Sequence, residues 1–321
     1  MRKLKVLLWI VAGALLGGCI KTPGNPNDLK PVPGMEKTFV VLPYGDGGAF
    51  WDKFREGAKH AAAEGGYKIQ WETPPPVWTI KQQEEALQTI TSLQPPGIIL
   101  GPLHRNRVQG RVSEAAELGI PVVVAASNED TTHQLTYVGS DNTALGKDLA
   151  QWVAQQTPDG GKIAVMKTQP GMRSVDMRLH ELLGELDGKP LQQIAFPADR
   201  DLNYQAINLQ KIMADTLQKY LQQNANVASV VAPDENSTVA AWNVLQKIPV
   251  AKRPRLFGVS VDPHLLKACN EGKIAVLVQQ NPYKMGELSA ASIIEFIYGR
   301  KPQQQIYVPY EIVHAAKPAE E

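Results

Sequence analysis

A glycine-rich stretch near the start of the chain, YGDGGAFW, holds the residue types that most suggest chemistry. Gly45, Gly47 and Gly48 follow an apolar run, and the adjacent aromatics Phe50 and Trp51 lead into a helical pattern. A strand, a glycine-rich turn and a helix can cradle a phosphate, because the first N–H groups of a helix point at the anion. The same order can instead present a flat aromatic face to another small solute. In the dinucleotide pattern G-x-G-x-x-G the third glycine would fall on Phe50, which weakens the phosphate interpretation.

Enzyme signatures elsewhere in the sequence are incomplete. The chain has no G-x-x-x-x-G-K-[ST] loop, its six histidines form no H-E-x-x-H pair, and the G-x-S-x-G pattern that begins at Gly258 ends in Asp262. Asp46, Asp234 and Glu235 follow expected strands and could form an acid/base pair, although Asp234 also suits the N-cap of the next helix. We therefore predict that the protein is not an enzyme and uses no cofactor or metal. A hydrolase on an α/β scaffold is the weaker alternative.

The N-terminal segment is typical of an export signal. Three basic residues among the first five precede a short apolar run, which ends in LGGC with the cysteine at Cys19. The run is too short to span about 30 Å of hydrocarbon, so it indicates a signal peptide over residues 1–18. Its ending resembles the lipobox of bacterial lipoproteins, in which this cysteine is acylated; an ordinary signal peptide is the alternative. Residues 19–36 are rich in proline, glycine and asparagine and predict a tether.

Composition and charge restrict the remaining classes of protein. The 321 residues, of which 43% are hydrophobic and 20% charged, suffice for two packed domains. The formal net charge is +1, and no Lys/Arg-rich run follows the first five residues, which argues against a nucleic-acid partner. With Cys19 acylated, Cys269 would be the one thiol left. It falls in a segment with a helical pattern, and we expect it to be buried and inert.

From Thr38 onward, apolar runs alternate with helical patterns, and the connections between them are short. Ile98–Leu100 and Val122–Val124 are apolar throughout, as expected for parallel strands that helices cover on both faces. The alternation starts again at Thr136, which predicts an α/β protein with two Rossmann-like lobes, each built on a parallel sheet. The expected strands are TFVVLP, YKIQW, GIILG, IPVVVAA, the start of TYVGSDN, KIAVMK, PLQQIAFP, VASVVA, RLFGVS and IAVLVQ, and then the extended segment IYVPYEIV.

The residues that follow these strands are expected to meet, because open parallel sheets bind ligands at the carboxyl ends of their strands. They mix aromatic rings, amides, hydroxyls and a few charges, which is more typical of a solute pocket than of a catalytic site. The strand-end segments are Tyr44–Trp51, Gly101–His104, Ala126–Asn128, Thr168–Arg173, Ala198–Arg200, Pro233–Asn236, Ser260–Asp262 and Gln279–Asn281.

Several short motifs at these strand ends and crossovers form a recognisable series. They are Phe50-Trp51 before the helical segment REGA, Ser140-Asp141-Asn142 with Gly146, Arg178, Pro197-Ala198-Asp199, Pro233-Asp234-Glu235, and Gln280 with Pro282 and Gly286. By these motifs and by its order of elements, the chain resembles the type I periplasmic binding proteins, in particular the ribose- and galactose-binding group, over about residues 38–309. Arg178 lies where that family has an arginine in the first helix of the second lobe.

The resemblance implies a bilobal clamp with a three-segment hinge, whose crossings fall near Asp141, Gln280 and Pro309. A solute binds in the cleft between the lobes, and closure of the hinge buries it. The boundaries implied are 37–140 plus 281–309 for the N-terminal lobe and 141–280 plus 310–321 for the C-terminal lobe.

The resemblance also implies a partner and a place in the cell. Lipidated members of the family deliver a solute to an ABC permease in the membrane, and the alternative is a receptor that presents the solute-bound form to a sensor kinase. We expect a monomer outside the cytoplasm, in the periplasm or at the cell surface, that Cys19 anchors to the membrane. Its expected ligand is a sugar or a sugar-like small solute.

The sequence departs from the sugar-binding pattern at four places, so several hydrogen bonds to an ordinary aldose would be missing. Two interpretations of the ligand stay open. It is a larger or modified carbohydrate, or it is another solute whose acidic group faces Arg178 and Arg200. The departures are Ala126-Ser127 in place of Asp-Arg, Pro233 in place of an asparagine, Val259-Ser260 in place of Phe-Asp, and Gly101 in place of an amide.

The predicted site combines stacking on Phe50 and Trp51 with charge-assisted hydrogen bonds from Arg178. Other tryptophans, such as Trp71, Trp152 and Trp242, are expected to pack in the core or at its rim. The predicted ligand-binding residues are Tyr44, Phe50, Trp51, Ser127, Asp141, Arg178, Arg200, Asp234 and Gln280.

Overall fold

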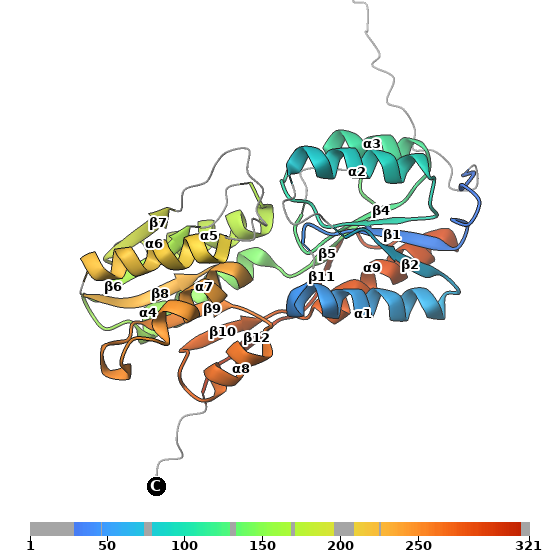
Figure 1. The fold of residues 1–321 in the computed structure, drawn as a ribbon. Coiled ribbons are helices and arrows are strands. Elements are labelled where there is room, and N and C mark those ends of the chain that lie inside the picture. The colour runs from blue at the N-terminus through green and yellow to red at the C-terminus, as the bar shows by residue number, and fades with distance from the viewer. Residues whose placement is uncertain are drawn as a thin grey trace, which may run out of the picture.

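Two six-stranded sheets with helices on their faces make up the described part of the chain (Figure 1). The computed structural model describes residues 29–45, 47–73, 79–128, 133–167, 171–195, 209–224 and 226–315. Cys19, Asp46 and Arg200, which the sequence singles out, lie outside these residues. Strands and helices alternate along most of the chain, so the predicted α/β class is confirmed. No described helix is both long and apolar enough to cross a membrane.

The first sheet is wholly parallel in its described pairs. From one edge to the other it contains β11 (Gln305–Tyr307), β5 (Thr136–Gly139), β4 (Val122–Ala125), β3 (Ile98–Leu100), β1 (Thr38–Leu42) and β2 (Lys68–Trp71). Helices α1 (Gly48–Glu64) and α9 (Pro282–Ile297) cover one face, and α2 (Ile80–Ser92) and α3 (Gln109–Glu117) cover the other (Figure 1). We call this sheet and its four helices the first lobe.

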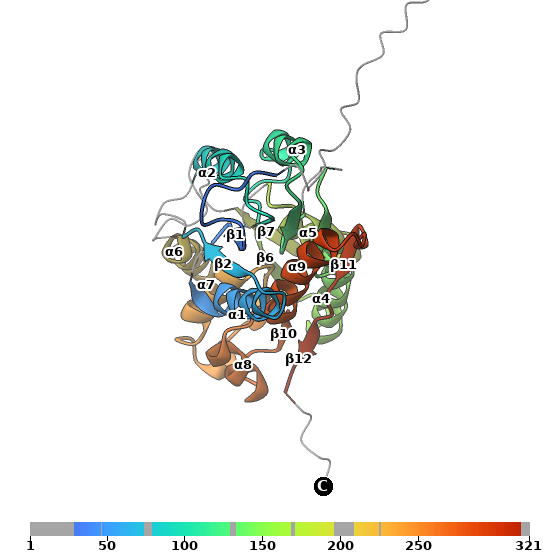
Figure 2. The same ribbon diagram turned by 90° about the vertical axis from the view of Figure 1, so that its right-hand side faces the viewer.

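The second sheet has the same layered plan. From one edge to the other it contains β12 (Glu311–Val313), β10 (Val276–Gln279), β9 (Arg255–Val259), β8 (Val227–Ala232), β6 (Lys162–Lys167) and β7 (Leu191–Ala195). Helices α4 (Asn142–Gln156) and α5 (Arg173–Glu185) pack on one face, and α6 (Leu209–Gln223), α7 (Glu235–Leu245) and α8 (Pro263–Asn270) belong to the core on the other. We call this sheet and its helices the second lobe, which stands beside the first (Figures 1 and 2).

The chain passes between the two lobes after β5, after β10 and after β11. Strand β12 runs antiparallel to β10. The second sheet is therefore mixed, whereas the sequence predicted a parallel sheet. The direction follows from the connections, because β10 leads out of the second lobe toward α9, whereas β12 enters that lobe from β11. The last extended segment of the sequence therefore supplies one edge strand to each sheet.

Two glycines let the backbones of α1 and α9 touch. A β-carbon on Gly57 would overlap the carbonyl of Tyr283, and one on Gly286 would overlap the carbonyl of Phe54. Both glycines belong to motifs that support the family resemblance, REGA and Q-x-P-x-x-x-G. Their function in this fold is close packing of α1 against α9.

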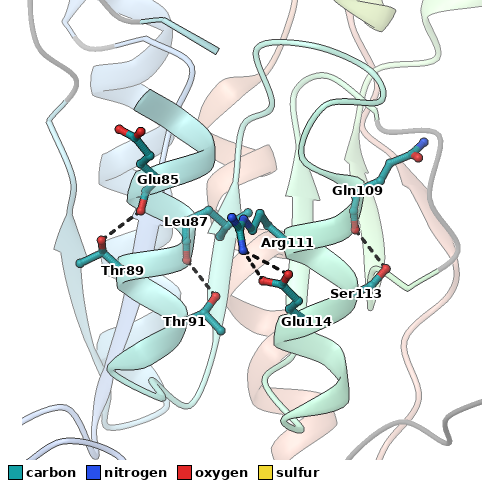
Figure 3. Close-up of polar contacts among 8 residues, drawn as sticks. All are labelled: Glu85, Leu87, Thr89, Thr91, Gln109, Arg111, Ser113 and Glu114. Carbon is teal, nitrogen blue, oxygen red and sulfur yellow. Dashed lines mark hydrogen bonds and ion pairs between the residues drawn. The ribbon is translucent and has the colours of Figure 1, made fainter. Parts of the chain in front are cut away.

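Helices α2 and α3 lie next to each other on the outer face of the first sheet, with their polar groups satisfied locally (Figure 3). Each contact drawn there joins two residues of the same helix. The bonds of Thr89, Thr91 and Ser113 run from a hydroxyl to the carbonyl one turn back, which is a usual pattern in helices. Apolar side chains such as Leu87 and Val112 instead pack beneath the helices, against the sheet. The drawn contacts are Thr89 to Glu85 at 3.0 Å, Thr91 to Leu87 at 2.8 Å, Ser113 to Gln109 at 3.0 Å, and Arg111 to Glu114 at 2.8 Å.

Cys269 lies in α8, as the helical pattern predicted, and its side chain is fully buried. Its Sγ donates to the carbonyl oxygen of Val313 at 3.1 Å, and burial raises the pKa of the thiol to about 11. A protonated, enclosed thiol is a poor nucleophile. Trp71, Trp152 and Trp242 pack against three different core clusters, as expected.

Candidate ligand-binding site

A cavity of about 590 Å³ lies between the lobes, a size ordinary for a small-molecule site. Its lining residues follow β1, β3 and β4 of the first lobe and β6, β8, β9 and β10 of the second, so both sheets contribute the carboxyl ends of their strands. Six of the nine predicted ligand-binding residues line it, namely Tyr44, Phe50, Trp51, Arg178, Asp234 and Gln280. Ser127 and Asp141 do not appear in the lining, and Arg200 lies outside the described residues.

The glycine-rich turn places the start of α1 at the cavity. Gly47 and Gly48 have φ angles of 73° and 77°, a left-handed conformation that glycine adopts without strain. Gly47 is the N-cap, and Gly47, Gly48 and Ala49 all line the cavity. The N-terminal end of α1, with its partial positive charge, therefore forms part of the wall.

The adjacent rings of Phe50 and Trp51 have different surroundings. The Trp51 side chain is only 5% exposed, and its ring packs edge-on against Phe54 and Trp71 at centroid distances of 5.3 and 6.0 Å. A β-carbon on Gly101 would lie 2.9 Å from the Trp51 ring, which explains why no amide side chain fits at that position. Phe50 is half-buried and reaches the cavity beside Tyr44. Most of the Trp51 surface thus belongs to the core, and Phe50 offers the more accessible ring.

Arg178 on α5 is buried at the opposite wall and is held by two hydrogen bonds. Its Nε donates to Asn142 Oδ1 at 2.7 Å, and its Nη1 donates to the carbonyl oxygen of Pro233 at 3.1 Å. A β-carbon on Gly146 of α4 would lie 2.5 Å from the Arg178 carbonyl, so this glycine lets the two helices approach. The family resemblance placed Arg178 in the first helix of the second lobe. Helix α4 also packs on the second sheet, so α5, which carries Arg178, is the second helix of that lobe.

The charge on Arg178 has neighbours across the cavity. Burial lowers the pKa of its guanidinium, while Tyr44, Tyr137 and Asp234 favour its charged form. Burial also raises the pKa of Tyr44 to about 12, against the opposing effect of Arg178, so the Tyr44 hydroxyl stays protonated at neutral pH. The arginine Nη2 has no hydrogen-bond partner among the residues that the structure describes. The second-lobe wall thus keeps a hydrogen-bond donor on Arg178.

Asp234 and Glu235 hold different positions at the start of α7. Asp234 is the N-cap and its Oδ1 accepts from the Ser237 N–H at 2.9 Å, so the capping interpretation of this residue is confirmed. Glu235 accepts from the Ser260 hydroxyl at 2.8 Å and from the Val261 N–H at 3.0 Å. Burial raises the pKa of Glu235 to about 7, although both hydrogen bonds lower it. Ser260, which replaces a family aspartate, therefore orients a carboxylate from the neighbouring strand end.

The other predicted residues serve the connections between the lobes. Asp141 caps α4, accepting from the Ala144 N–H at 3.0 Å. Gln280 lines the cavity and its Nε2 donates to the Ser140 hydroxyl at 2.9 Å, which joins two of the crossings. Ser127 is buried and its hydroxyl accepts from the Ser174 N–H at 3.3 Å.

A further link between the lobes, which we call the interlobe latch, consists of His104, Arg105, Gly171 and Asp176. The Arg105 N–H donates to the Gly171 carbonyl at 2.8 Å, and its Nη1 lies 3.8 Å from Asp176 Oδ2. Gly171 has a φ of 103°, and a β-carbon there would overlap the His104 ring. His104, the last residue of an expected strand-end segment, therefore contacts the other lobe. The sequence pattern does not pair His104 and Arg105 with Gly171 and Asp176, because more than sixty positions separate the two pairs.

The cavity also has residues that the sequence did not name as ligand-binding, although Met172 and Asp262 fall in two of the expected strand-end segments. Met172, Leu209 and Met213 add apolar surface from the second lobe, and Asp262 adds a third carboxylate beside Asp234 and Glu235. Asp262 precedes Pro263 at the start of a helical pattern and follows a strand, so strand-end position and N-cap chemistry together could have selected it.

Two α/β lobes with three crossings between them and a solute-sized cavity at their facing strand ends define a bilobal solute-binding protein. A family model described as periplasmic binding protein domain matches residues 39–301. The chain belongs to this family, which confirms the resemblance seen in its motifs.

Individual relatives are distant but cover most of the chain. The ribose import binding protein of Haemophilus influenzae is 23% identical over 318 residues, covering 97% of this chain and 99% of that protein. An Agrobacterium vitis ABC transporter solute-binding protein, solved with α-D-tagatopyranose, superposes with a TM-score of 0.77 at 20% identity, covering 87% and 95%. A XylFII–LytSN complex contains a chain that superposes with a TM-score of 0.75 at 17% identity, covering 87% and 98%. At these identities the solved structures establish the fold alone.

Proposed function

We propose that this protein is a lipid-anchored, extracytoplasmic solute-binding protein of an ABC importer, and that it binds a sugar or sugar-like solute by hinge closure. The observation that carries the proposal is the cavity, to which both lobes contribute. Arg178 on one side faces Phe50 and Tyr44 on the other. A solute that contacts both walls favours the closed form, because only that form makes both sets of contacts. The named functions of the Haemophilus and Agrobacterium relatives support the same assignment.

The available contacts are sufficient for the affinity that such a function needs. A micromolar dissociation constant corresponds to about −8 kcal/mol. Stacking on Phe50, a hydrogen bond from Tyr44 and a charge-assisted bond from Arg178 could supply much of it. Closure would bend the chain at the three crossings near Asp141, Gln280 and Pro309, with the lobe boundaries predicted from the sequence.

The central test is binding of small polyhydroxylated solutes. Protein purified without refolding is denatured, and any released solute is identified by mass spectrometry. The same preparation is then titrated calorimetrically with a panel of pentoses, hexoses and polyols. We expect at least one to bind with a dissociation constant in the micromolar range and to raise the melting temperature. If no sugar or polyol shifts the melting temperature, the proposed function is wrong.

The lipid anchor is tested separately on Cys19. Full-length chain expressed in a bacterial host is fed an alkyne fatty acid, and membrane and soluble fractions are compared with those of Cys19→Ser. We expect label and membrane association in the parent chain and neither in the variant, since two acyl chains suffice for stable anchoring. Equal membrane association of both chains would contradict the anchor.

A receptor role is the second candidate. It is favoured by the XylFII–LytSN complex, in which a chain of this fold is joined to another protein. The two roles differ in the membrane partner that co-purifies with the solute-bound form. Capture of a permease supports import, capture of a sensor kinase supports signalling, and the neighbouring genes give the same distinction.

A further inference from the structure

The charged groups that the described residues contribute to the cavity are confined to one wall. Among the described lining residues, Arg178, Asp234, Glu235 and Asp262 carry charges, and all four belong to the second lobe. The described lining residues of the first lobe are aromatic, apolar or glycine. Three carboxyl groups therefore share the second-lobe wall with a single guanidinium, and we call these three the acidic wall.

No cation forms an ion pair with the acidic wall within the described part of the chain. Arg178 lies beyond ion-pair distance of its carboxylates, and its own bonds go to Asn142 and to the carbonyl of Pro233. Both neighbouring carboxylates raise the pKa of Glu235, as expected for like charges that share a partly buried space. The wall thus has a net negative character that a bound solute can satisfy.

Each carboxylate of the acidic wall keeps hydrogen-bonding capacity. Asp234 and Asp262 use Oδ1 to cap their helices, and Oδ2 of each has no hydrogen-bond partner among the described residues. The two oxygens of Glu235 each accept one bond, from Ser260 and from Val261, and a carboxylate oxygen can accept a second. Capping therefore accounts for only part of the polar surface that these groups present.

We propose that the acidic wall selects solutes by charge, favouring a carbohydrate that bears an amino group over a neutral sugar and disfavouring sugar acids and sugar phosphates. This inference rests on the proposed function and names its substrate class. An ammonium group supplies several N–H donors and a positive charge that complements the wall. An anion would face uncompensated carboxylates, while Arg178, held on two sides, offers it a single free nitrogen. Of the two arginines that the acidic-solute interpretation invoked, only Arg178 belongs to the described residues, and its single free nitrogen is a weak basis for binding an anion.

Matched series of sugars that differ only in charge test the selection. The full chain is titrated at about pH 7, where the amino sugars still carry their ammonium group, with glucosamine, glucose and glucuronate, and with galactosamine, galactose and galacturonate. At this pH Glu235, whose pKa is about 7, is partly ionised and a bound ammonium favours its ionised form; its facing groups are Asp234, Asp262, Arg178 and Tyr44. In each series that binds, we expect the amino sugar to bind at least about tenfold tighter than the acid, with the neutral sugar between them. Equal or tighter binding of the acid overturns the selection and leaves the proposed function standing, whereas failure of all sugars to bind removes both.

Charge-removing variants distinguish the wall from general packing. Asp262→Asn keeps an N-cap residue of equal quality, so α8 is retained while the charge is lost. Glu235→Gln removes the second charge, and Glu185→Gln removes an exposed carboxylate of the same lobe outside the cavity as a matched control. We expect the first two to lower the ratio of amino-sugar to neutral-sugar affinity about three- to tenfold, and the control to leave it unchanged. If both cavity variants weaken the two sugars equally, the wall is structural and the inference fails.

Discussion

The two walls of the cavity are made of different chemistry. Among the described residues, the first-lobe wall presents rings, apolar side chains and the glycine backbone at the start of α1, whereas the second-lobe wall presents one arginine and three carboxylates. Rings can cover the apolar faces of a solute without choosing between polar groups. Fixed charges discriminate, because a mismatched group leaves them desolvated and unpaired. The comparison suggests that the first wall determines how much of a solute is buried and the second determines which solute is retained.

The two walls are supported in different ways, one by aromatic packing and the other by helix N-termini. The rings of the first wall rest on a packed aromatic cluster that includes Trp51, Phe54 and Trp71. The carboxylates of the second wall lie at the starts of α7 and α8, where backbone N–H groups and the helix dipole stabilise negative charge. A substitution among the buried rings that support the first wall should therefore affect mainly stability, and one among the carboxylates of the second wall mainly selectivity.

The largest effect is expected from Trp51→Ala. The ring is almost fully buried, so its removal should lower the free energy of unfolding by about 3–5 kcal/mol, as for other large-to-small core changes. Chemical denaturation monitored by circular dichroism measures this loss. The matched change is Phe50→Ala, which removes a half-buried ring at the same wall and should leave stability within about 1 kcal/mol while weakening solute binding.

The opposite result would reverse the roles of the two rings. If Trp51→Ala unfolds at the parent denaturant concentration and has lost its solute, Trp51 is the stacking platform that the sequence suggested. Solute affinity of the folded fraction must therefore be measured for both variants.

On the second wall, Arg178→Ala is expected to weaken solute binding about 30- to 100-fold, since hydrogen bonds to a charged group contribute about 1.5–3 kcal/mol. The variant should keep its fold, because Asn142 and the Pro233 carbonyl can take water into the vacated space. Isothermal titration gives the affinity, and circular dichroism gives the fold. Arg178→Lys is the matched variant, which keeps the charge but cannot bond Asn142 and Pro233 at once. Parent-like affinity in Arg178→Ala would remove this arginine from the site.

The sequence predicted the architecture well because its signals are local. Apolar runs such as Ile98–Leu100 and the capping residues Asp141 and Asp234 each depend on a few neighbouring positions. The direction of β12 was missed because it depends on the entry of the chain from the other lobe, which no local pattern encodes. The interlobe latch was missed for the same reason, because its residues come from different lobes.

The site was predicted less completely, for a similar reason. Phe50 and Trp51 are equivalent as sequence letters, and only the packing of Phe54 and Trp71 shows that the second ring is buried. The space beside Gly101, where the family has an amide side chain, is likewise filled by the ring of Trp51, which is fifty positions away in the sequence. Charge balance across a cavity is a property of several strand ends at once, so the acidic wall could not be recognised from any one motif.

A smaller effect concerns the pH dependence of stability, which should come from one wall only. The pKa of Glu235 is raised from 4.5 to about 7, so the folded state holds a proton that the unfolded state has released between these values. The stability that this proton provides is present below about pH 4.5 and is lost as the pH rises through about 7, by about 1–3 kcal/mol. The Tyr44 hydroxyl, with a pKa of about 12, does not titrate in this range.

Denaturation midpoints measured at intervals between about pH 4 and 8 test this difference. Glu235→Gln should flatten the decline of stability with rising pH, and Glu185→Gln, the exposed control, should preserve that decline. A decline that persists unchanged in Glu235→Gln would assign the titration to another group.

The smallest expected effect comes from the interlobe latch, whose residues His104 and Gly171 are next in sequence to the lining residues Leu103 and Met172. Its ion pair spans 3.8 Å between partly exposed side chains, and such pairs contribute at most about 1 kcal/mol. Arg105→Ala should therefore weaken solute binding only about two- to fivefold, by favouring the open form. Arg107→Ala is the matched control, because Arg107 pairs with Glu84 at 3.2 Å within the first lobe. The radius of gyration of the solute-free protein should increase in the first variant and not in the second. If the two variants behave alike, the latch does not bias closure, and the difference between the walls alone governs solute capture.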